Sequence, residues 1–149
     1  MDTLQVRHTT SASPEAVWDV LADGWRYPCW VVGASRMRAV ERGFPAAGTK
    51  LHHSVGSWPL LLDDDTEVLE SQPARLLRIR AKTRPFGTAV VTLTLEPAAD
   101  GGTTITMAED ADSGPIKAVP MVARQAAITP RNRESMLRLA LLAERADQP

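Results

Sequence analysis

The middle of the chain consists of short segments in which apolar and polar residues alternate, separated by turns that contain glycine or proline. The alternation is clearest over residues 76–83, 89–96 and 103–110. Successive side chains of a β-strand point to opposite faces, so a period of two predicts strands with one apolar face. The Asp-Gly-Gly turn at residues 100–102 is typical of a hairpin. The pattern predicts an antiparallel sheet whose apolar face must be covered by another element.

Two short helices are predicted between the first strand and the rest of the sheet. Ser13 and Pro14 mark a helix start, because a serine oxygen accepts hydrogen bonds from the first free amides and proline fits the first helical position. Asp23 and Gly24 end this helix, and residues 25–30 form a second, shorter helical segment. Further strands are predicted at residues 4–10, 36–41, 49–55 and 61–70.

A long C-terminal helix completes the predicted fold. Thr129 and Pro130 repeat the helix-start chemistry, residues 131–145 carry a broad apolar stripe, and residues 117–128 are predicted to be partly helical. This helix is the only predicted element long enough to cover the apolar face of the sheet. The fold class is therefore α+β, with a curved antiparallel sheet around the helix, a cavity between them and one domain over residues 1–149.

Composition excludes several classes of function. The 149 residues include 17 basic and 18 acidic side chains, a net charge of −1 that provides no general attraction to nucleic acid. Cys29 is the only cysteine, so no intrachain disulfide can form and a reducing, cytoplasmic location is expected. The longest apolar stretch, at residues 139–143, is far shorter than the ~20 residues of a membrane-spanning helix, and the N-terminal residues do not form a signal-peptide pattern.

Four segments carry a resemblance that covers nearly the whole chain. They are SPEAVW at 13–18, YPCWVVG at 27–33, GTKLHHSVG at 48–56 and RNRE at 131–134. With these segments and the predicted order of its strands and helices, the chain resembles the START-like helix-grip superfamily, also called SRPBCC. The resemblance is strongest to the small stand-alone bacterial members. That superfamily includes the birch-pollen-allergen family and the polyketide cyclase/dehydrase and lipid-transport proteins. The resemblance implies a deep, mostly apolar pocket that binds lipids, sterols or polyketides, with cyclisation or hydrolysis in some members and no shared catalytic motif.

Candidate polar residues for the pocket come from the strand patterns. His52 and His53 are adjacent on a strand and point to opposite faces, so they are not expected to share a metal ion. His53 falls on the apolar face, as a hydrogen-bonded wall residue or as a base for proton transfer. Glu109 shares the face of Met107, either as a residue at the rim paired with arginine or lysine, or as a buried acid.

The predicted ligand-binding residues add two tryptophans beside loops and two positions on the inner stripe of the long helix. Indole rings provide broad apolar walls with one hydrogen-bond donor. The complete predicted set is Trp30, His53, Trp58, Met107, Glu109, Asn132 and Met136. No metal and no cofactor is expected.

Three functions remain open at this point. The first is binding of a small hydrophobic molecule in the cavity. The second is a cyclase or dehydratase that uses His53 with Glu109, although no catalytic motif identifies an enzyme. The third is a protein-interaction module whose pocket is filled by its own side chains. The protein is expected to be a monomer or a homodimer that binds no nucleic acid. The basic row Arg78, Arg80 and Lys82 is interpreted as a solvated outer face with acidic partners such as Glu67.

Overall fold

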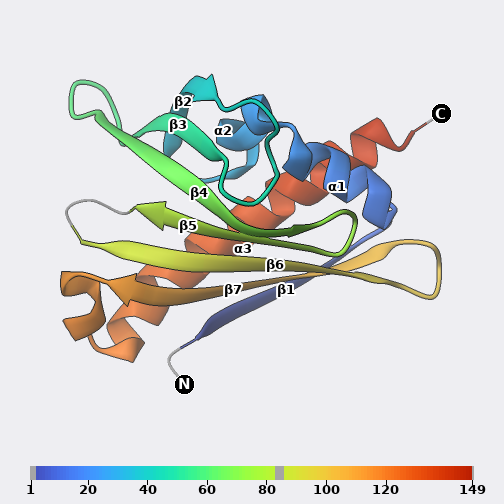
Figure 1. Cartoon of the computed structure of the whole chain (residues 1–149). Helices are drawn as coiled ribbons and strands as arrows, with labels where there is room; N and C mark the ends of the chain where they lie inside the picture. The colour runs from blue at the N-terminus through green and yellow to red at the C-terminus, as the bar shows by residue number, and fades with distance from the viewer. Residues whose placement is uncertain (1–2, 83–85, 149) are drawn as a thin grey trace.

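The computed structural model describes residues 3–82 and 86–148 of the chain. Within these residues, seven strands precede a long C-terminal helix, and shorter helices follow β1 and β7 (Figure 1). The strands are β1 (Leu4–Thr10), β2 (Ala34–Val40), β3 (Lys50–Val55), β4 (Leu62–Gln72), β5 (Leu76–Lys82), β6 (Thr88–Pro97) and β7 (Thr103–Ser113). The helices are α1 (Pro14–Ala22), η1 (Gly24–Arg26), α2 (Tyr27–Trp30), η2 (Pro115–Ala118) and α3 (Met121–Ala146).

The strands form one antiparallel sheet in the order β1-β7-β6-β5-β4-β3-β2. Each strand from β2 to β6 pairs with the next strand along the chain, as short turns favour. The first strand returns to pair with β7 at one edge. This arrangement confirms the predicted fold class, an α+β fold with a curved antiparallel sheet, short helices after the first strand and a long C-terminal helix. One predicted strand ended at Thr83, which lies outside the described residues.

Helix α1 starts where the sequence predicts. The Ser13 hydroxyl accepts a hydrogen bond from the Ala16 amide at 3.1 Å, and Pro14 occupies the first helical position. The helix buries Val17 and Val20 completely. It thereby packs against α3 and closes one end of the molecule.

Helix α3 corrects the predicted start at Thr129 and Pro130. The helix begins at Met121, directly after Pro120, and Pro130 lies in its interior. An interior proline costs about 3 kcal/mol, and here it provides no N–H for the carbonyl of Ala126. The preceding segment is rich in good helix formers such as alanine, arginine, glutamine and methionine, which favour continuing the helix. The prediction that this region is partly helical therefore understated the helix by two turns.

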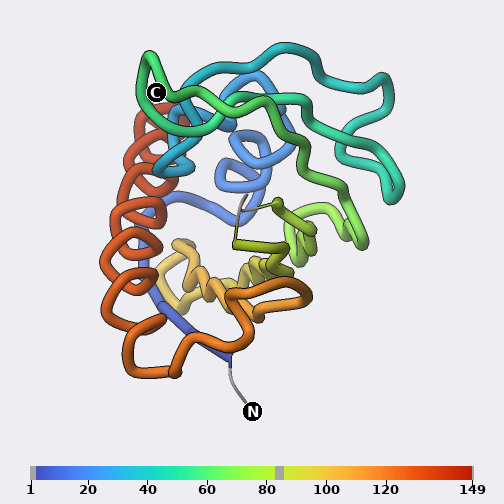
Figure 2. Tube along the Cα trace, turned by 90° about the vertical axis from the view of Figure 1, so that its left-hand side faces the viewer, coloured from blue at the N-terminus to red at the C-terminus, as the bar shows by residue number. Residues whose placement is uncertain are grey.

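The sheet curves around α3 without touching it everywhere. Helix α3 packs mainly against β1, α1 and α2, with a smaller contact to β7. At the other edge of the sheet, α2 packs on β2. Figure 2 looks at the end of the molecule where α3 lies on one side and the strands curve round the other. Because both edges of the sheet are attached near the helix, the middle strands lie farther from it.

The core consists of the inward positions of the sheet and the buried stripe of α3. Leu93 and Ile105 are completely buried, as is Leu139 on the helix. These residues belong to one hydrophobic cluster that also includes α1. The alternating pattern of the sequence thus identified the inward face correctly.

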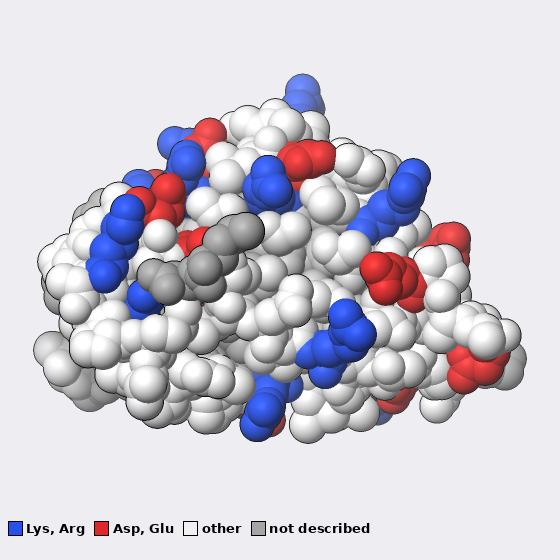
Figure 3. Space-filling model, turned by 90° about the horizontal axis from the view of Figure 1, so that it is seen from below, with Lys and Arg blue, Asp and Glu red and all other residues white. Residues whose placement is uncertain are grey.

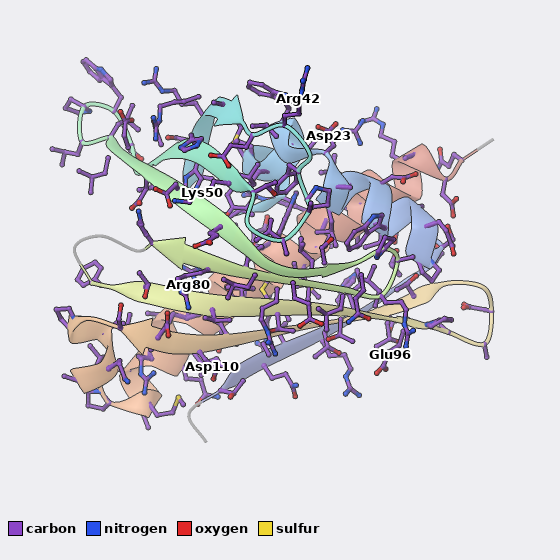
Figure 4. All side chains as sticks on the ribbon, viewed as in Figure 1. Asp23, Arg42, Lys50, Arg80, Glu96 and Asp110 are labelled. Atoms are coloured by element: carbon purple, nitrogen blue, oxygen red, sulfur yellow. The ribbon has the colours of Figure 1, made fainter. Side chains whose placement is uncertain are left out.

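The opposite face of the sheet is polar. Lys50 and Arg80 project on the side away from α3 (Figure 4). Arg80 donates to Asp112 at 2.7 Å, and Arg78 lies 3.7 Å from Glu70. The acidic partners differ from the expected Glu67, but the basic row has the predicted cross-strand pairing. Seen from below, basic and acidic side chains are interspersed on a largely uncharged surface (Figure 3).

No helix in the described part of the chain is both long and apolar enough to cross a membrane.

Candidate functional site

A cavity of about 330 Å³ lies between the middle of α3 and the inner face of the sheet. We call it the main cavity. Side chains from α2, from the inner face of the sheet and from α3 form its wall, which is mostly apolar. At its mouth stand residues of the β3–β4 and β5–β6 connections, of which Leu60 and Phe86 are exposed to solvent. A mostly apolar wall with a few polar groups is typical of ligand sites.

Five of the seven predicted binding residues line the main cavity. They are Trp30, His53, Met107, Glu109 and Asn132. They come from α2, β3, β7 and α3, four elements that are distant in sequence. Trp58 and Met136 do not line it.

Trp58 lies on the surface because of the turn that precedes it. Its exposed fraction is 83%. Gly56 has a φ of +95°, and a Cβ atom there would meet the Leu60 carbonyl oxygen at 2.7 Å. The Leu60 amide donates to the carbonyl of Ser57 at 2.7 Å. The chain therefore doubles back on itself, and the tip of the turn carries Trp58 away from the cavity.

Met136 lies on the predicted inner stripe of α3, but beyond the cavity. Asn132 and Ser135 are the last helix residues on the cavity wall. Met136 is completely buried and belongs to the same core cluster as Val17 and Val20 of α1. The cavity ends where α1 fills the space beneath the helix.

Glu109 is the centre of a buried ionic cluster. Arg131 Nη2 donates to both of its carboxylate oxygens, at 2.8 and 3.0 Å, and Asn132 Nδ2 donates to Oε2 at 3.1 Å. Only 7% of the Glu109 side chain is exposed, against 36% for Arg131. A buried carboxylate is tolerable when it is paired and hydrogen-bonded in this way. The pairing with arginine matches one of the two predicted roles of Glu109, although the residue is buried and does not lie at an exposed rim.

His53 belongs to a second, neutral cluster. Its Nε2 lies 2.8 Å from the Thr66 hydroxyl, which lies 3.3 Å from the Tyr27 hydroxyl. The rings of Tyr27 and His53 have centroids 5.2 Å apart. Burial lowers the pKa of His53, while the charge of Asp64 opposes the shift, and burial raises the pKa of Tyr27. Both side chains are therefore uncharged at neutral pH.

The candidate pair His53 and Glu109 lines one cavity but forms two separate clusters. His53 bonds to Thr66, and Glu109 is engaged by Arg131 and Asn132. Both carboxylate oxygens of Glu109 are thus bonded to side chains of α3 and not to His53. His52 lies on the other face of β3 and bonds to Glu41 at 3.0 Å, so the two histidines do not converge. No group of three or more potential metal ligands occurs among residues 3–82 and 86–148.

A second cavity of about 320 Å³ lies beside the first, between β1, β6, β7, η2 and the first turns of α3. Its wall is apolar apart from Glu109, Arg124 and Arg131. Phe86, Glu109 and Arg131 line both cavities. The Phe86 carbonyl accepts a hydrogen bond from the Ile116 amide at 2.8 Å, which ties the β5–β6 connection to η2. Phe86 and the ion pair therefore form a shared wall.

Comparison with known proteins identifies the family. The family model described as "Polyketide cyclase / dehydrase and lipid transport" matches residues 1–144. The chain belongs to this family. A comparison with curated proteins gives no match.

Solved structures with a similar fold agree with this assignment. The Zhui aromatase/cyclase from Streptomyces sp. R1128 is 18% identical, with a TM-score of 0.74 over 98% of this chain and 95% of that one. Protein CV1439 from Chromobacterium violaceum is 20% identical, with a TM-score of 0.72 over 95% and 97% of the two chains. Ara h 8.0201 is 13% identical, with a TM-score of 0.68 over 95% and 97%. At these identities the likeness concerns the fold, and it confirms the helix-grip resemblance.

The sequence pattern of this member of the polyketide cyclase/dehydrase and lipid-transport family does not predict two residues of the site, Arg131 and Tyr27. The pattern predicts that Arg131 lies in the first turn of a helix that starts at Pro130, and nothing in the pattern indicates that its side chain faces inward. Tyr27 belongs to the short aromatic segment at residues 25–30, whose pattern does not indicate which ring faces inward. The one indication in the sequence that Arg131 reaches the cavity is its position directly before Asn132, which is predicted to face inward.

Proposed function

We propose that this protein binds a small hydrophobic molecule in the main cavity. The observation that carries the proposal is a space of about 330 Å³ with a mostly apolar wall and a mouth at the β3–β4 and β5–β6 connections. Moving apolar ligand surface into such a space is favourable by ~25 cal/mol per Å² before the costs of ordering. Membership of a family that includes lipid-transport proteins supports this function.

Native mass spectrometry and dye binding test the proposal together. The purified protein is expected to carry an apolar molecule that organic extraction releases. After removal of that molecule, the protein is expected to bind one equivalent of the neutral dye Nile red.

Two phenylalanine variants locate the dye. Val91 lines the cavity, and Val90 precedes it on the same strand with its side chain on the opposite face. Val91→Phe fills the cavity and is expected to weaken dye binding by at least about tenfold, whereas Val90→Phe leaves it unchanged. Equal binding by both variants and the wild type would place the dye elsewhere and contradict the proposal.

An enzyme that moves a proton on its bound ligand is the second candidate. It is favoured by the neutral His53 and Tyr27 side chains, which both line the main cavity. The test is the mass and the hydrogen–deuterium content of the extracted ligand after incubation with the protein in heavy water. Exchange of carbon-bound hydrogen that is lost in His53→Gln supports catalysis, while an unchanged ligand supports binding alone.

We also propose that the protein acts in the cytoplasm as a monomer or homodimer. A free thiol at Cys29, the only cysteine of the chain, supports a reducing compartment. Cell fractionation and light scattering of the purified protein test the two statements.

A further inference from the structure

Some of the hydrogen-bond donors of Arg131 have no acceptor among the described residues. Its Nη2 bonds to Glu109, and Nε and Nη2 both lie 3.4 Å from Asn132 Oδ1. A guanidinium group carries five N–H donors in a fixed plane. No described residue accepts a hydrogen bond from Nη1, and the side chain is 36% exposed. Two donors on a rigidly held group are thus available at the wall of the cavities.

The charge around these donors selects the kind of acceptor. Arg131 and Glu109 form an ion pair at 2.8 Å, and their opposite charges cancel. A carboxylate or phosphate bound to Nη1 would be repelled by the Glu109 carboxylate, whose side chain is only 7% exposed. A carbonyl oxygen can accept the same hydrogen bonds without this repulsion.

The ion pair also has apolar space on two sides. The main and the second cavity measure about 330 and 320 Å³ and share Phe86, Glu109 and Arg131 as wall. Each corresponds to about ten water-sized volumes. Arg131 therefore lies at the boundary of two compartments, each able to hold a short alkyl chain.

Accepting the proposed binding function, we propose that the ligand is a neutral molecule with two apolar arms joined at a carbonyl group. Long-chain ketones and esters are the simplest members of this class. One arm occupies the main cavity and the other the second cavity. The carbonyl oxygen accepts a hydrogen bond from Arg131 Nη1, which makes Arg131 the residue that determines specificity.

Four probes of equal chain length test this inference by competition with Nile red. They are a ketone with its carbonyl on the middle carbon, a methyl ketone, the alkane and the straight-chain carboxylic acid. The mid-chain ketone is expected to bind at least about tenfold more tightly than the alkane, because it adds a hydrogen bond to a charged donor. It is also expected to bind more tightly than the methyl ketone and the acid.

A double variant removes the donor without leaving a buried charge. In Arg131→Met with Glu109→Leu both members of the pair become apolar, a change that is often tolerated. It is expected to lose the preference for the ketone, so that the ketone binds no more tightly than the alkane does to the same variant. The matched control replaces the exposed neighbours, Arg133→Met with Glu134→Leu, and is expected to keep the full preference for the ketone.

The outcomes separate this inference from the function on which it rests. If none of the four probes displaces the dye, the proposed binding function fails. If the alkane binds and the ketone binds no more tightly than the alkane, Arg131 does not donate a hydrogen bond to a carbonyl group of the ligand. The same conclusion follows if the double variant still binds the ketone more tightly than the alkane. Tighter binding of the acid would overturn the neutral ligand, and equal binding of the methyl ketone would overturn the two-arm arrangement.

Discussion

The two halves of α3 have the same amphipathic pattern, but one half packs into a solid core and the other half borders cavities. From Met136 onward, the buried stripe packs against α1 in a solid core, where Leu139 and Ala143 are completely inaccessible. Before Met136, the same stripe faces two cavities, and Arg131, Asn132 and Ser135 form part of a cavity wall. What differs is the element beneath the helix. Helix α1, nine residues long, packs against the second half of α3 and lines neither cavity.

The composition of the stripe follows this division. The solid half presents alanine, leucine and methionine, whose contacts are to other protein atoms. The half that faces the cavities presents alanine and isoleucine together with Arg131, Asn132 and Ser135, and each of these three has a hydrogen-bond partner in the protein. The buried polar residues of α3 thus all lie before Met136, in the half that faces the cavities.

The largest expected effect contrasts a leucine of the solid half with an isoleucine of the cavity wall. Leu139→Ala is expected to lower the free energy of unfolding by about 3–5 kcal/mol, because it opens a new void in a packed core. Ile79→Ala is expected to cost only about 2 kcal/mol, because one side of Ile79 already faces the main cavity and makes fewer contacts. Urea denaturation measures both values. Equal losses would show that the two ends are packed alike.

The next effect compares the arginine at the cavities with one on the surface of the same helix. Arg131→Met leaves the Glu109 carboxylate buried without its cation and is expected to cost about 2–4 kcal/mol. Arg138 pairs with Glu134 in solvent at 3.0 Å, and Arg138→Met is expected to change stability by no more than about 0.5 kcal/mol. Thermal and urea denaturation provide the comparison. A loss below about 1 kcal/mol for Arg131→Met would mean that water already solvates Glu109.

The smallest expected effect is a pH dependence from His53. Burial lowers the pKa of His53 below its ordinary value of 6.5, so between those two values the unfolded chain binds more protons than the folded one. The free energy of unfolding is therefore expected to fall as the pH decreases through 6.5 toward the folded-state pKa.

Two histidine variants assign this pH dependence. His53→Gln is expected to remove this part of the dependence, and His52→Gln, on the solvent-exposed face of β3, is expected to keep it. Urea denaturation between neutral and mildly acidic pH measures the slope in each protein. The same slope in His53→Gln and the wild type would show that His53 is hydrated in the folded state.

The fold and the inward face of the sheet could be predicted because they depend on a simple period. Alternation along β7 placed Met107 and Glu109 on the inner face, and alternation along β3 did the same for His53. The Ser13 cap and Pro14 predicted the start of α1 by local chemistry alone.

The remaining features depend on contacts that no local pattern contains. Pro130 resembled a helix start, but the preceding residues continue the helix, so Arg131 lies in its interior. The outward position of Trp58 follows from a tight turn at Gly56, which the residue types alone did not reveal. The end of the cavity at Met136 follows from the length of α1, a tertiary relation between elements distant in the chain.

A methyl NMR titration with an apolar ligand tests most directly whether the open half of the molecule is the binding site. The delipidated protein is labelled at its isoleucine, leucine, valine and methionine methyl groups and titrated with the mid-chain ketone or with Nile red. We expect large shifts for Ile79, Val91 and Met107 on the cavity wall, and none for Val17, Val20 and Leu139 in the solid half. Shifts confined to the solid half or to the exposed surface, or no shifts at saturating ligand, would contradict the account.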